Sequence, residues 1–570
     1  MTETPIKPPS NRIGKTAIIA VIIVAIVIIA AVVIVVEERK AVTPAPSKSV
    51  EFYNWYATEG KVALDHMASA FYNTTGIKVS SYVSPGAGGT NAIYAILALV
   101  EAGKPPATFQ VHFGPAMVSY VEAAPNGINS FVNLGSAANS MGLTNNSFPG
   151  VIESGAYNGT LLSLPLEAQQ GDQLYFNPNF LKEYKQPIPE NISQLASVTE
   201  NLSKMGVTAW IIPGGDGGWD QLQVWEDTFL AVGGNTMYDQ LMYGSIPSSQ
   251  LSTFYHDFNI TNDYFSIFWN DSYPGEASMT WTQAIPLVTG GKVGFQANGD
   301  WYTNYAFDYL NVTDYPATSP YDNNITNSNY RNSNPVTIDG KNISLMNEDF
   351  PGTSEYYVTT SDSIAVPVGP NEANGIRFAE YASSYNGNLI FTKWKAATFY
   401  DNVTTDYYNT PAQYYGYQEA KTTPDNKWVY QLSDGGMFNG PLASIESSMT
   451  SFSESFSKTT SNSTYASANS VLDSQLLKTF KDEEQDWISA NKLGLGYLGS
   501  PGHIFGGYLP SWANTSANRT ASKYGLVKSG GATASNVESN SSVIVYTSPF
   551  SLLYLENMVI GGILPKIFIF

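Results

Sequence analysis

The sequence predicts an α/β fold built on a parallel sheet and preceded by one transmembrane helix. Two observations support this prediction: short apolar runs alternate with helical patterns between residues 50 and 113, and residues 16–36 carry no charge. Strands that alternate with helices form parallel sheets whose faces the helices cover. The roughly 520 residues beyond the apolar run suffice for two or three domains, and they show no repeat of fixed period.

Strands and helices follow one another in a regular order. Strands are predicted at the short apolar runs, residues 50–56, 77–83, 108–113, 161–166, 174–176, 293–296 and 363–367. Helices are predicted where apolar residues recur three or four positions apart, at residues 62–71, 90–100, 178–184, 221–231, 281–289 and 374–384. Thr90 is the expected N-cap of the second of these helices.

Residues 16–36, almost all Ala, Val and Ile, form the predicted transmembrane helix. At 1.5 Å per residue this run spans roughly 30 Å, the thickness of a bilayer core. Residues 1–15 are predicted to be a signal or cytoplasmic segment, and 37–48 a linker. Basic residues flank the run on both sides, so the positive-inside rule says little about its orientation.

Asn-X-Ser/Thr triplets indicate that the part after the apolar run is exported and glycosylated. About fifteen of them, Asn201, Asn402 and Asn518 included, are spread along it. Only 13% of the residues are charged. Because carboxylates lose their charge near pH 4, a surface of hydroxyls, amides and glycans stays soluble in acid, where a Lys/Glu surface would become strongly cationic. We therefore expect a cell-surface glycoprotein in an acidic extracellular habitat.

Charge and residue usage exclude several functional classes. The formal net charge of −20 argues against nucleic acid and against an anionic membrane surface as partners. The chain has no Cys, which excludes disulfides, thiol catalysis and Cys-ligated zinc, and its four His disfavour a His-based metal site. The Gly-rich segment 84–89 lacks the Lys-Ser/Thr of a phosphate-binding loop, and Asp216 and Asp220 lack the spacing of an EF-hand. No cofactor is expected.

Several local motifs occur in a characteristic order. An aromatic pair followed by an acid lies at 54–60, a Gly-rich turn at 85–91, Lys-Pro-Pro-Ala-Thr-Phe-Gln-Val-His at 104–112, and Gly-Gly-Lys-Val through Gly-Asp-Trp at 290–301, before Phe-Pro-Gly-Thr at 350–353 and Ser-Asp-Ser at 361–363. Together they resemble the family-1 extracellular solute-binding proteins, specifically the glucose- and mannose-type members, over roughly residues 50–440. The Gly-Asp-Trp segment resembles the commonest signature of that family, and Thr-Phe-Gln-Val-His resembles its sugar receptors.

The resemblance implies a two-lobe periplasmic-binding-protein-like fold of type II, whose lobes close over a ligand by a hinge motion. It places lobe 1 at 48–163 and 293–358 and lobe 2 at 164–292 and 359–460, with 461–570 as a C-terminal extension packed on the lobes. It also implies the function: binding of glucose or a related monosaccharide and delivery to the permease subunits of an ABC transporter.

The N-terminus resembles a variant of the same family. Arg12-Ile13-Gly14-Lys15 before an uninterrupted apolar run resembles the pilin-like signal peptides of archaeal sugar-binding proteins. Cleavage ahead of the run would leave the helix on the mature protein. A single-pass membrane protein with an extracellular ectodomain is therefore expected.

A neutral sugar offers paired hydroxyls and an apolar ring face, so its site needs polar side chains, aromatic rings and exclusion of water. Gln110 and His112 share one face of a strand and can point into a cleft together. Asp300 and Trp301 place an acid beside a ring. Glu59 would accept hydrogen bonds from hydroxyls, or it is a first-turn acid favoured by the helix dipole.

Aromatic candidates follow from the same requirement. By the alternation of a strand, one of Trp55 and Tyr56 borders the sugar and the other lies in the core. Trp219 is a second ring for the sugar, or it packs within its own loop.

Four further candidates depend on position along the chain. Glu167 and Gln170 lie at the predicted crossover between the lobes. The resemblance adds Lys395, where relatives have a sugar-binding Lys, and Asn439, where some have a His. Tyr56 stands where relatives carry a second Trp.

Two other functions are compatible with the sequence. Glu59 and Asp300 could be the paired carboxylates of a surface glycosidase, which requires a separation of about 5–5.5 Å or 6.5–9.5 Å. The apolar helix would also permit a structural role as a surface-layer or pilus-like subunit.

Overall fold

A computed structural model describes residues 48–479, apart from 87–88, 149–150, 158–159, 243–245, 248, 318–335, 339, 405–406, 437–438, 456–473 and 477. The predicted signal segment at 1–15, the transmembrane helix at 16–36, all but the last residue of the linker and most of the predicted extension at 461–570 lie outside these residues. Among the helices that the structure describes, none is long and apolar enough to cross a membrane.

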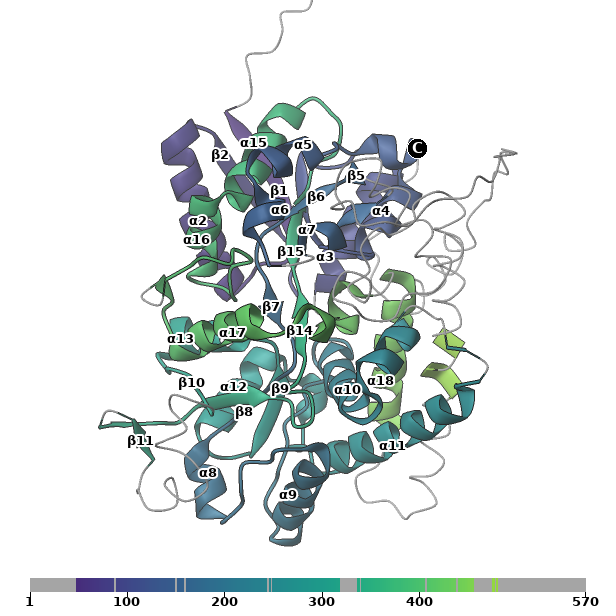
Figure 1. The fold of residues 1–570 in the computed structure, drawn as a ribbon, viewed down its shortest axis with the longest axis vertical. Coiled ribbons are helices and arrows are strands. Elements are labelled where there is room, and N and C mark those ends of the chain that lie inside the picture. The colour runs from purple at the N-terminus through teal and green to yellow at the C-terminus, as the bar shows by residue number, and fades with distance from the viewer. Residues whose placement is uncertain are drawn as a thin grey trace, which may run out of the picture. The chain divides into compact units, whose positions relative to one another are not determined.

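The first sheet has five strands in the order β2-β1-β3-β15-β6 (Figure 1). β1 (Ser49–Asn54) runs parallel to β2 (Lys78–Val83) and to β3 (Thr108–His112). β15 (Asp362–Ala365) is antiparallel to both β3 and β6 (Ser163–Pro165). The parallel half of this sheet confirms the alternation predicted for the beginning of the chain.

Helices α2 (Glu59–Thr75) and α3 (Thr90–Glu101) connect the parallel strands. α2 is amphipathic: Met67 and Phe71, four positions apart, lie on its buried face, and it ends at Gly76 in the left-handed conformation with φ 70°. The other elements that accompany the first sheet are α4 (Ala116–Ala123), a 3-10 turn (Gly127–Ser130), α5 (Gly135–Ser140), α6 (Leu143–Asn146), α7 (Val151–Ser154), β4 (Ala156–Tyr157), β5 (Thr160–Leu161), α15 (Glu372–Ser383) and α16 (Tyr385–Thr392).

The N-cap of α3 differs from the prediction. Gly89, with φ 94°, occupies the cap position, and Thr90 is the first residue of the helix. The hydroxyl of Thr90 instead donates to Oε2 of Glu446 at 3.3 Å. The predicted cap at Thr90 is therefore wrong by one position, because a glycine can adopt the left-handed turn that enters the helix.

The second sheet has four strands in the order β10-β13-β8-β9. β8 (Gln173–Phe176) pairs antiparallel with β9 (Phe295–Asn298) and with β13 (Met346–Asp349), and β10 (Tyr315–Pro316) runs parallel to β13. Its helices are α8 (Pro178–Glu183), α9 (Ile192–Lys204), α10 (Trp219–Met242), α11 (Leu251–Asn270), a 3-10 turn (Glu276–Ser278), α12 (Trp281–Thr289) and α13 (Trp301–Leu310).

The pairing of β9 contradicts the predicted division into lobes. Residues 293–358 are predicted to belong with the first sheet, but β9 pairs with β8, and β13 does so on the other side. Residues 359–460 are predicted to belong with the second sheet, but β15 lies between β3 and β6, and α15 packs against β1 and β6. Strand partners are set by hydrogen bonds between distant segments, which the local pattern of a strand does not reveal.

A small third sheet connects the first sheet with its helices, here called the first lobe, to the second sheet with its helices, called the second lobe. It comprises β7 (Gln169–Gln170), β14 (Tyr357–Thr360) and β16 (Trp428–Tyr430), in the order β16-β14-β7. β7 follows β6 of the first sheet and precedes β8 of the second, and β14 leads directly into β15. In Figure 1 β7 and β14 lie between the two larger sheets. The remaining elements are β11 (Thr337–Ile338), β12 (Lys341–Asn342), α17 (Pro411–Thr422), a 3-10 turn (Asp425–Lys427), a single helical turn at Leu432–Gly436, and α18 (Asn439–Ser455).

Buried aromatic side chains form much of the core of the second lobe. Trp210 and Trp225 are fully buried, and their indole N–H groups donate to Thr199 at 2.9 Å and to Asn262 at 2.6 Å. Full burial of a large apolar side chain contributes about 1.5–3 kcal/mol, and a buried indole N–H needs such a partner. The elements around the candidate site are therefore held by a packed core.

Candidate ligand-binding site

The candidate site lies where strands of both large sheets end. Tyr56 follows β1, His112 ends β3 and Asp300 follows β9. Asp362 begins β15, whose antiparallel register places it directly opposite His112. Ligands of open α/β sheets bind at the carboxyl ends of the strands. The topology therefore gathers Tyr56, His112 and Asp362 at one edge of the first sheet, and Asp300 approaches them from the end of β9.

Lys395, in the loop after α16, lies at the centre of the buried cluster. Its Nζ atom is 3.6 Å from Oδ2 of Asp362 and 3.9 Å from Oε1 of Glu167. The same atom lies 5.4 Å from the ring centroid of Tyr56 and 5.8 Å from that of Trp301. One ammonium group thus lies close to two acids and two rings that come from four separate segments of the chain.

His112 connects the two sides of the cluster. Its Nδ1 atom lies 3.4 Å from Oδ1 of Asp362, and its Nε2 atom lies 3.9 Å from Oδ1 of Asp434. Its ring is 4.9 Å from that of Trp55. The neighbouring Gln110 accepts the backbone N–H of Trp55 with its Oε1 atom at 3.0 Å. As predicted from their spacing in the strand, Gln110 and His112 face the same side.

Trp55 and Tyr56 both border the cluster, on different sides. The Tyr56 hydroxyl donates to Oδ2 of Asp362 at 2.9 Å, and the ring is almost completely buried. Trp55 is half-buried and packs on His112. The alternation expected for the pair holds in part: Tyr56 belongs to the core, yet its hydroxyl also reaches an acid of the cluster.

The second lobe contributes one acid and two indole rings. Asp300 immediately precedes α13, and its backbone N–H donates to the carbonyl of Gln170 at 2.9 Å. Trp301 stacks on Trp219, with ring centroids 5.7 Å apart and planes 29° from parallel. The sequence predicts Asp300 and Trp301 as a pair and Trp219 as a separate ring, and the structure stacks Trp219 on Trp301.

Two acids of the cluster are absent from the predicted set. In the sequence Asp362 stands out only as part of the Ser-Asp-Ser motif, and Asp434 lies in the helical turn before α18. Asp434 accepts the indole N–H of Trp219 at 3.1 Å and is buried beside His112. The only local signal for Asp434 is an acid followed by two glycines, which is typical of any turn.

Burial and charge shift the pKa values of the acids in opposite directions. Burial raises the pKa of Asp300 to about 7, although Lys395 opposes the shift. Burial likewise raises the pKa of Glu59 and raises that of Glu167 well above its usual range, again against Lys395. Burial also acts to raise the pKa of Asp362, but Lys395 and His112 outweigh it and hold that pKa below its ordinary value.

The two basic groups respond to the same balance. Burial lowers the pKa of His112, with Asp362 acting against the shift. Burial alone would lower the pKa of Lys395, but Glu167, Asp362 and the other acids raise it above its ordinary value. Lys395 is therefore charged, Asp362 is its carboxylate partner, and His112 is disposed to be neutral.

The remaining predicted residues have different positions. Glu59 begins α2 and is buried. Burial raises its pKa, and the charge of Lys395 acts to lower it. Gln170 contributes its backbone carbonyl, which accepts the N–H of Asp300. Its side-chain amide instead donates to Asp349 on β13 at 3.1 Å and to Glu419 on α17 at 2.9 Å. Asn439 begins α18, and its side chain lies outside the described part of the structure.

The cluster offers hydrogen-bond acceptors without protein donors. Among the described residues, Oδ1 of Asp300 and Oε2 of Glu167 are buried and have no hydrogen-bond partner. Unpaired buried carboxyl oxygens are costly unless a ligand donates to them. Within the described ranges no group of three or more acids and histidines has the geometry to hold a metal ion. The arrangement suits a neutral molecule with several hydroxyl donors and an apolar face for the two indoles.

Comparison with known proteins agrees with this chemistry. Residues 54–340 match the family model described as bacterial extracellular solute-binding protein. The chain is 44% identical over 507 residues to the glucose-binding protein GlcS of Saccharolobus solfataricus, a match that covers 89% of this chain and 84% of that protein.

Two solved structures share the fold. A chitin oligosaccharide binding protein superimposes with a TM-score of 0.56 at 13% identity, covering 77% of this chain and 100% of that one. The bacterial solute receptor AcbH superimposes with a TM-score of 0.55 at 13% identity, covering 76% and 99%. The mixed α/β, periplasmic-binding-protein-like fold is thereby confirmed. Together with the family model and the similarity to GlcS over most of both sequences, this shows that the chain belongs to the family of bacterial extracellular solute-binding proteins.

Proposed function

We propose that this protein binds glucose or a related neutral monosaccharide in the cluster around Lys395 and delivers it to the permease subunits of an ABC transporter. The observation that carries the proposal is the composition of the cluster: one lysine faces the acids Glu59, Glu167, Asp300, Asp362 and Asp434, beside the stacked indoles of Trp219 and Trp301. The 44% identity to a glucose-binding protein supports glucose as the first sugar to test.

The chemistry of the cluster matches a sugar in three respects. Hydroxyl groups of a sugar can donate to the unpaired oxygens of Asp300 and Glu167. The ammonium of Lys395 and a protonated carboxyl can donate to sugar oxygens. An indole supplies a flat apolar surface for the ring face, as in other small-molecule sites.

Isothermal titration calorimetry of the full-length protein in detergent tests the proposal. Glucose, galactose and mannose should be compared. Asp300→Asn is the site variant, and Asn201→Gln, at an exposed position of helix α9 outside the cluster, is the control. A hydrogen bond to a charged group contributes about 1.5–3 kcal/mol, so Asp300→Asn should weaken binding roughly 10- to 100-fold, and Asn201→Gln should leave it unchanged. Absence of binding to any of the sugars would contradict the proposal.

We propose further that the protein is a single-pass membrane protein. In this proposal the apolar run at 16–36 is retained behind a pilin-like signal and holds a type II two-lobe ectodomain outside the cell. The length and lack of charge of the run support it. Membrane fractionation of the full chain, compared with a chain that begins at residue 48, measures it directly. Equal recovery of both chains in the soluble fraction would contradict it.

We also propose that the cluster around Lys395 binds its sugar without cleaving it. The alternative is hydrolysis by Glu59 and Asp300, and the family consists of binding proteins. Incubation with nitrophenyl glycosides should release no nitrophenol above the level of the Asp300→Asn variant. Turnover that this substitution abolishes would establish an enzyme instead.

A further inference from the structure

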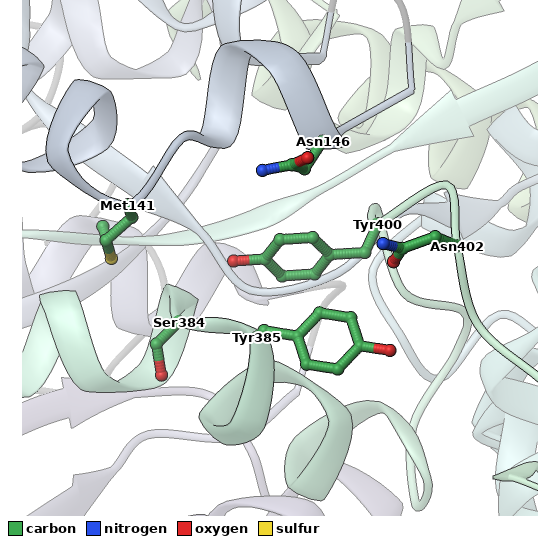
Figure 2. A pocket seen from close by; sticks show the side chains of 6 residues that line it. All are labelled: Met141, Asn146, Ser384, Tyr385, Tyr400 and Asn402. Atoms are coloured by element: carbon green, nitrogen blue, oxygen red, sulfur yellow. The ribbon is translucent and has the colours of Figure 1, made fainter.

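A cavity of about 340 Å³ lies on the first lobe and contains none of the residues of the Lys395 cluster. Figure 2 shows the side chains that line it, Met141, Asn146, Ser384, Tyr385, Tyr400 and Asn402. Its volume is at the lower end of small-molecule sites, which hold about 300–1,000 Å³. The cavity therefore has room for a single sugar ring.

Two tyrosine rings form the apolar part of this cavity. The rings of Tyr385 and Tyr400 lie 5.1 Å apart and meet edge to face at 73°. Tyr400 is buried, and its hydroxyl donates to the carbonyl of Ser383 at 2.7 Å, so this ring is fixed. Tyr385 is 40% exposed and presents ring surface to the outside. An exposed ring beside a fixed one is a suitable surface for the apolar face of a sugar.

The rim of the cavity is polar and held in place by the backbone. Asn146 and Asn402 contribute amides, and Ser384 contributes a hydroxyl. The backbone N–H of Asp401 donates to the carbonyl of Asn146 at 3.1 Å, and that of Val403 donates to the hydroxyl of Tyr417 at 2.8 Å. Both neighbours of Asn402 are thus anchored, and its side chain has a defined place at the rim.

Asn402 is also the first residue of an Asn-Val-Thr triplet. Asn402 and Thr404 are both exposed, whereas Val403 between them is buried. No described residue hydrogen-bonds the amide of Asn402, and Figure 2 shows its side chain among those that line the cavity. The triplet whose asparagine lines this cavity therefore has an amide that no other residue in the described part of the chain occupies, and an accessible threonine.

We propose that Asn402 carries an N-linked glycan whose first sugar lies in this cavity against Tyr385. In the modification, the amide nitrogen of Asn402 forms a bond to the anomeric carbon of a phosphate-activated glycosyl donor. The bond from that carbon to the phosphate oxygen breaks, the phosphate leaves with its electron pair, and the amide gives up one proton. A separate glycosyltransferase catalyses this step during export. The inference is independent of what the Lys395 cluster binds.

Covalent attachment explains why so small a cavity can be occupied. A free monosaccharide must overcome the loss of its translational and rotational freedom, and an open site of this size offers little to offset that loss. A sugar linked to Asn402 is already at the rim, and its effective concentration there is in the millimolar range or above. Weak stacking on Tyr385 is then sufficient to keep it in the cavity.

Glycopeptide mass spectrometry of the full chain from its own source tests the attachment. The peptide that contains Asn402 should carry a glycan mass, and Asn402→Gln and Thr404→Val should each abolish it. Thr404→Ser should preserve it, because serine also serves in the triplet. An unmodified Asn402 peptide, in a sample whose other triplets are modified, would overturn the proposal.

Thermal unfolding of the variants tests the location of the sugar. Asn402→Gln should lower Tm by about 1–4 °C in the parent protein and by no measurable amount in a Tyr385→Ala background. Asn201→Gln, at an exposed triplet on α9, should have the same effect in both backgrounds. Equal effects of Asn402→Gln with and without the Tyr385 ring would show that the glycan does not lie in the cavity, even if it is attached.

Discussion

The Nζ atom of Lys395 lies 3.6 Å from Oδ2 of Asp362, and both side chains are almost completely buried. Breaking a buried ion pair by removing one partner costs about 3–5 kcal/mol, because the other charge is left uncompensated. We therefore expect Lys395→Met to lower the free energy of unfolding by about that amount, and Lys395→Met with Asp362→Asn to recover part of it. Chemical denaturation of the sugar-free protein measures both.

The matched control is the ion pair of Lys204 and Glu200, 3.2 Å apart on the exposed face of α9. Exposed pairs contribute about 0–1 kcal/mol. Lys204→Met should therefore leave the unfolding curve nearly unchanged. If Lys395→Met were as mild as this control, the cluster would not contain a buried charge pair.

Asp314 makes the stability of the fold depend on pH. Its carboxyl is buried and accepts the hydroxyl of Thr303 at 2.6 Å, and burial raises its pKa from 3.8 to about 7. Because the folded pKa exceeds the unfolded one, the stabilisation is fully present below about pH 4 and is lost as the pH rises through 7. Tm should therefore fall between pH 4 and pH 7.5, and Asp314→Asn should make this fall smaller. An unchanged fall in the variant would contradict the assignment.

Glu419 and Asp349 form a hydrogen-bonded carboxyl pair between α17 and β13. Gln170 donates to both acids, and Gln173 donates to Asp349 at 3.0 Å. Burial raises the pKa of Glu419 well above its usual range, and Asp349 raises it further, so Glu419 holds the proton of the pair. Glu419→Gln keeps a donor toward Asp349 at every pH. It should raise Tm at pH 7.5 and leave Tm at pH 4 nearly unchanged.

The exposed Glu101 at the end of α3 provides the control for this prediction. Glu101→Gln makes the same substitution at an exposed position, away from the carboxyl pair. Differential scanning calorimetry at the two pH values should show no gain for it at pH 7.5. A gain equal to that of Glu419→Gln would mean that net charge, and not the pair, determines the effect.

Trp219 joins the acid Asp434 to the ring of Trp301. Trp219→Phe keeps a ring for stacking but loses the N–H that donates to Asp434 at 3.1 Å. We expect sugar affinity to fall roughly 10-fold for Trp219→Phe and further for Trp219→Ala, because the second variant also removes the ring. Trp281→Phe, on α12, should bind as the parent does. Calorimetric titration with equal affinities for Trp219→Phe and the parent would remove Trp219 from the site.

Local patterns predicted the elements well where one segment determines its own structure. The helix predicted at 281–289 is α12 with these bounds, and its capping box at Thr280 and Gln283 explains why the beginning is sharp. The strand predicted at 108–113 is β3, and its alternation correctly placed Gln110 and His112 on one side. Each of these predictions depends only on periodicity and capping within a few residues.

Long-range pairing limited what could be predicted of the site and of the lobes. Asp434 reaches the cluster because β16 pairs with β14, which brings the turn after β16 to the beginning of β15. Gln170 was expected beside the sugar, but β7 directs its amide toward Asp349 and Glu419. No local pattern around either residue specifies these partners. The positions of Lys395 and Asp300 could be predicted only because a family resemblance carries such long-range information.

The position of β15 in the first sheet has a consequence for how the chain folds. β15 lies between β3 and β6, yet it begins 250 residues after the end of β3 and 197 after the end of β6, and the whole second sheet is formed by the segment between β6 and β15. The first sheet therefore cannot close until the chain has been synthesised beyond residue 365, whereas β8, β9 and β13 can pair earlier. Contacts of such sequence separation slow folding and leave strand edges open in the meantime. The strand that closes the first sheet is thus synthesised after all four strands of the second sheet, and the edges of β3 and β6 stay unpaired with β15 until then.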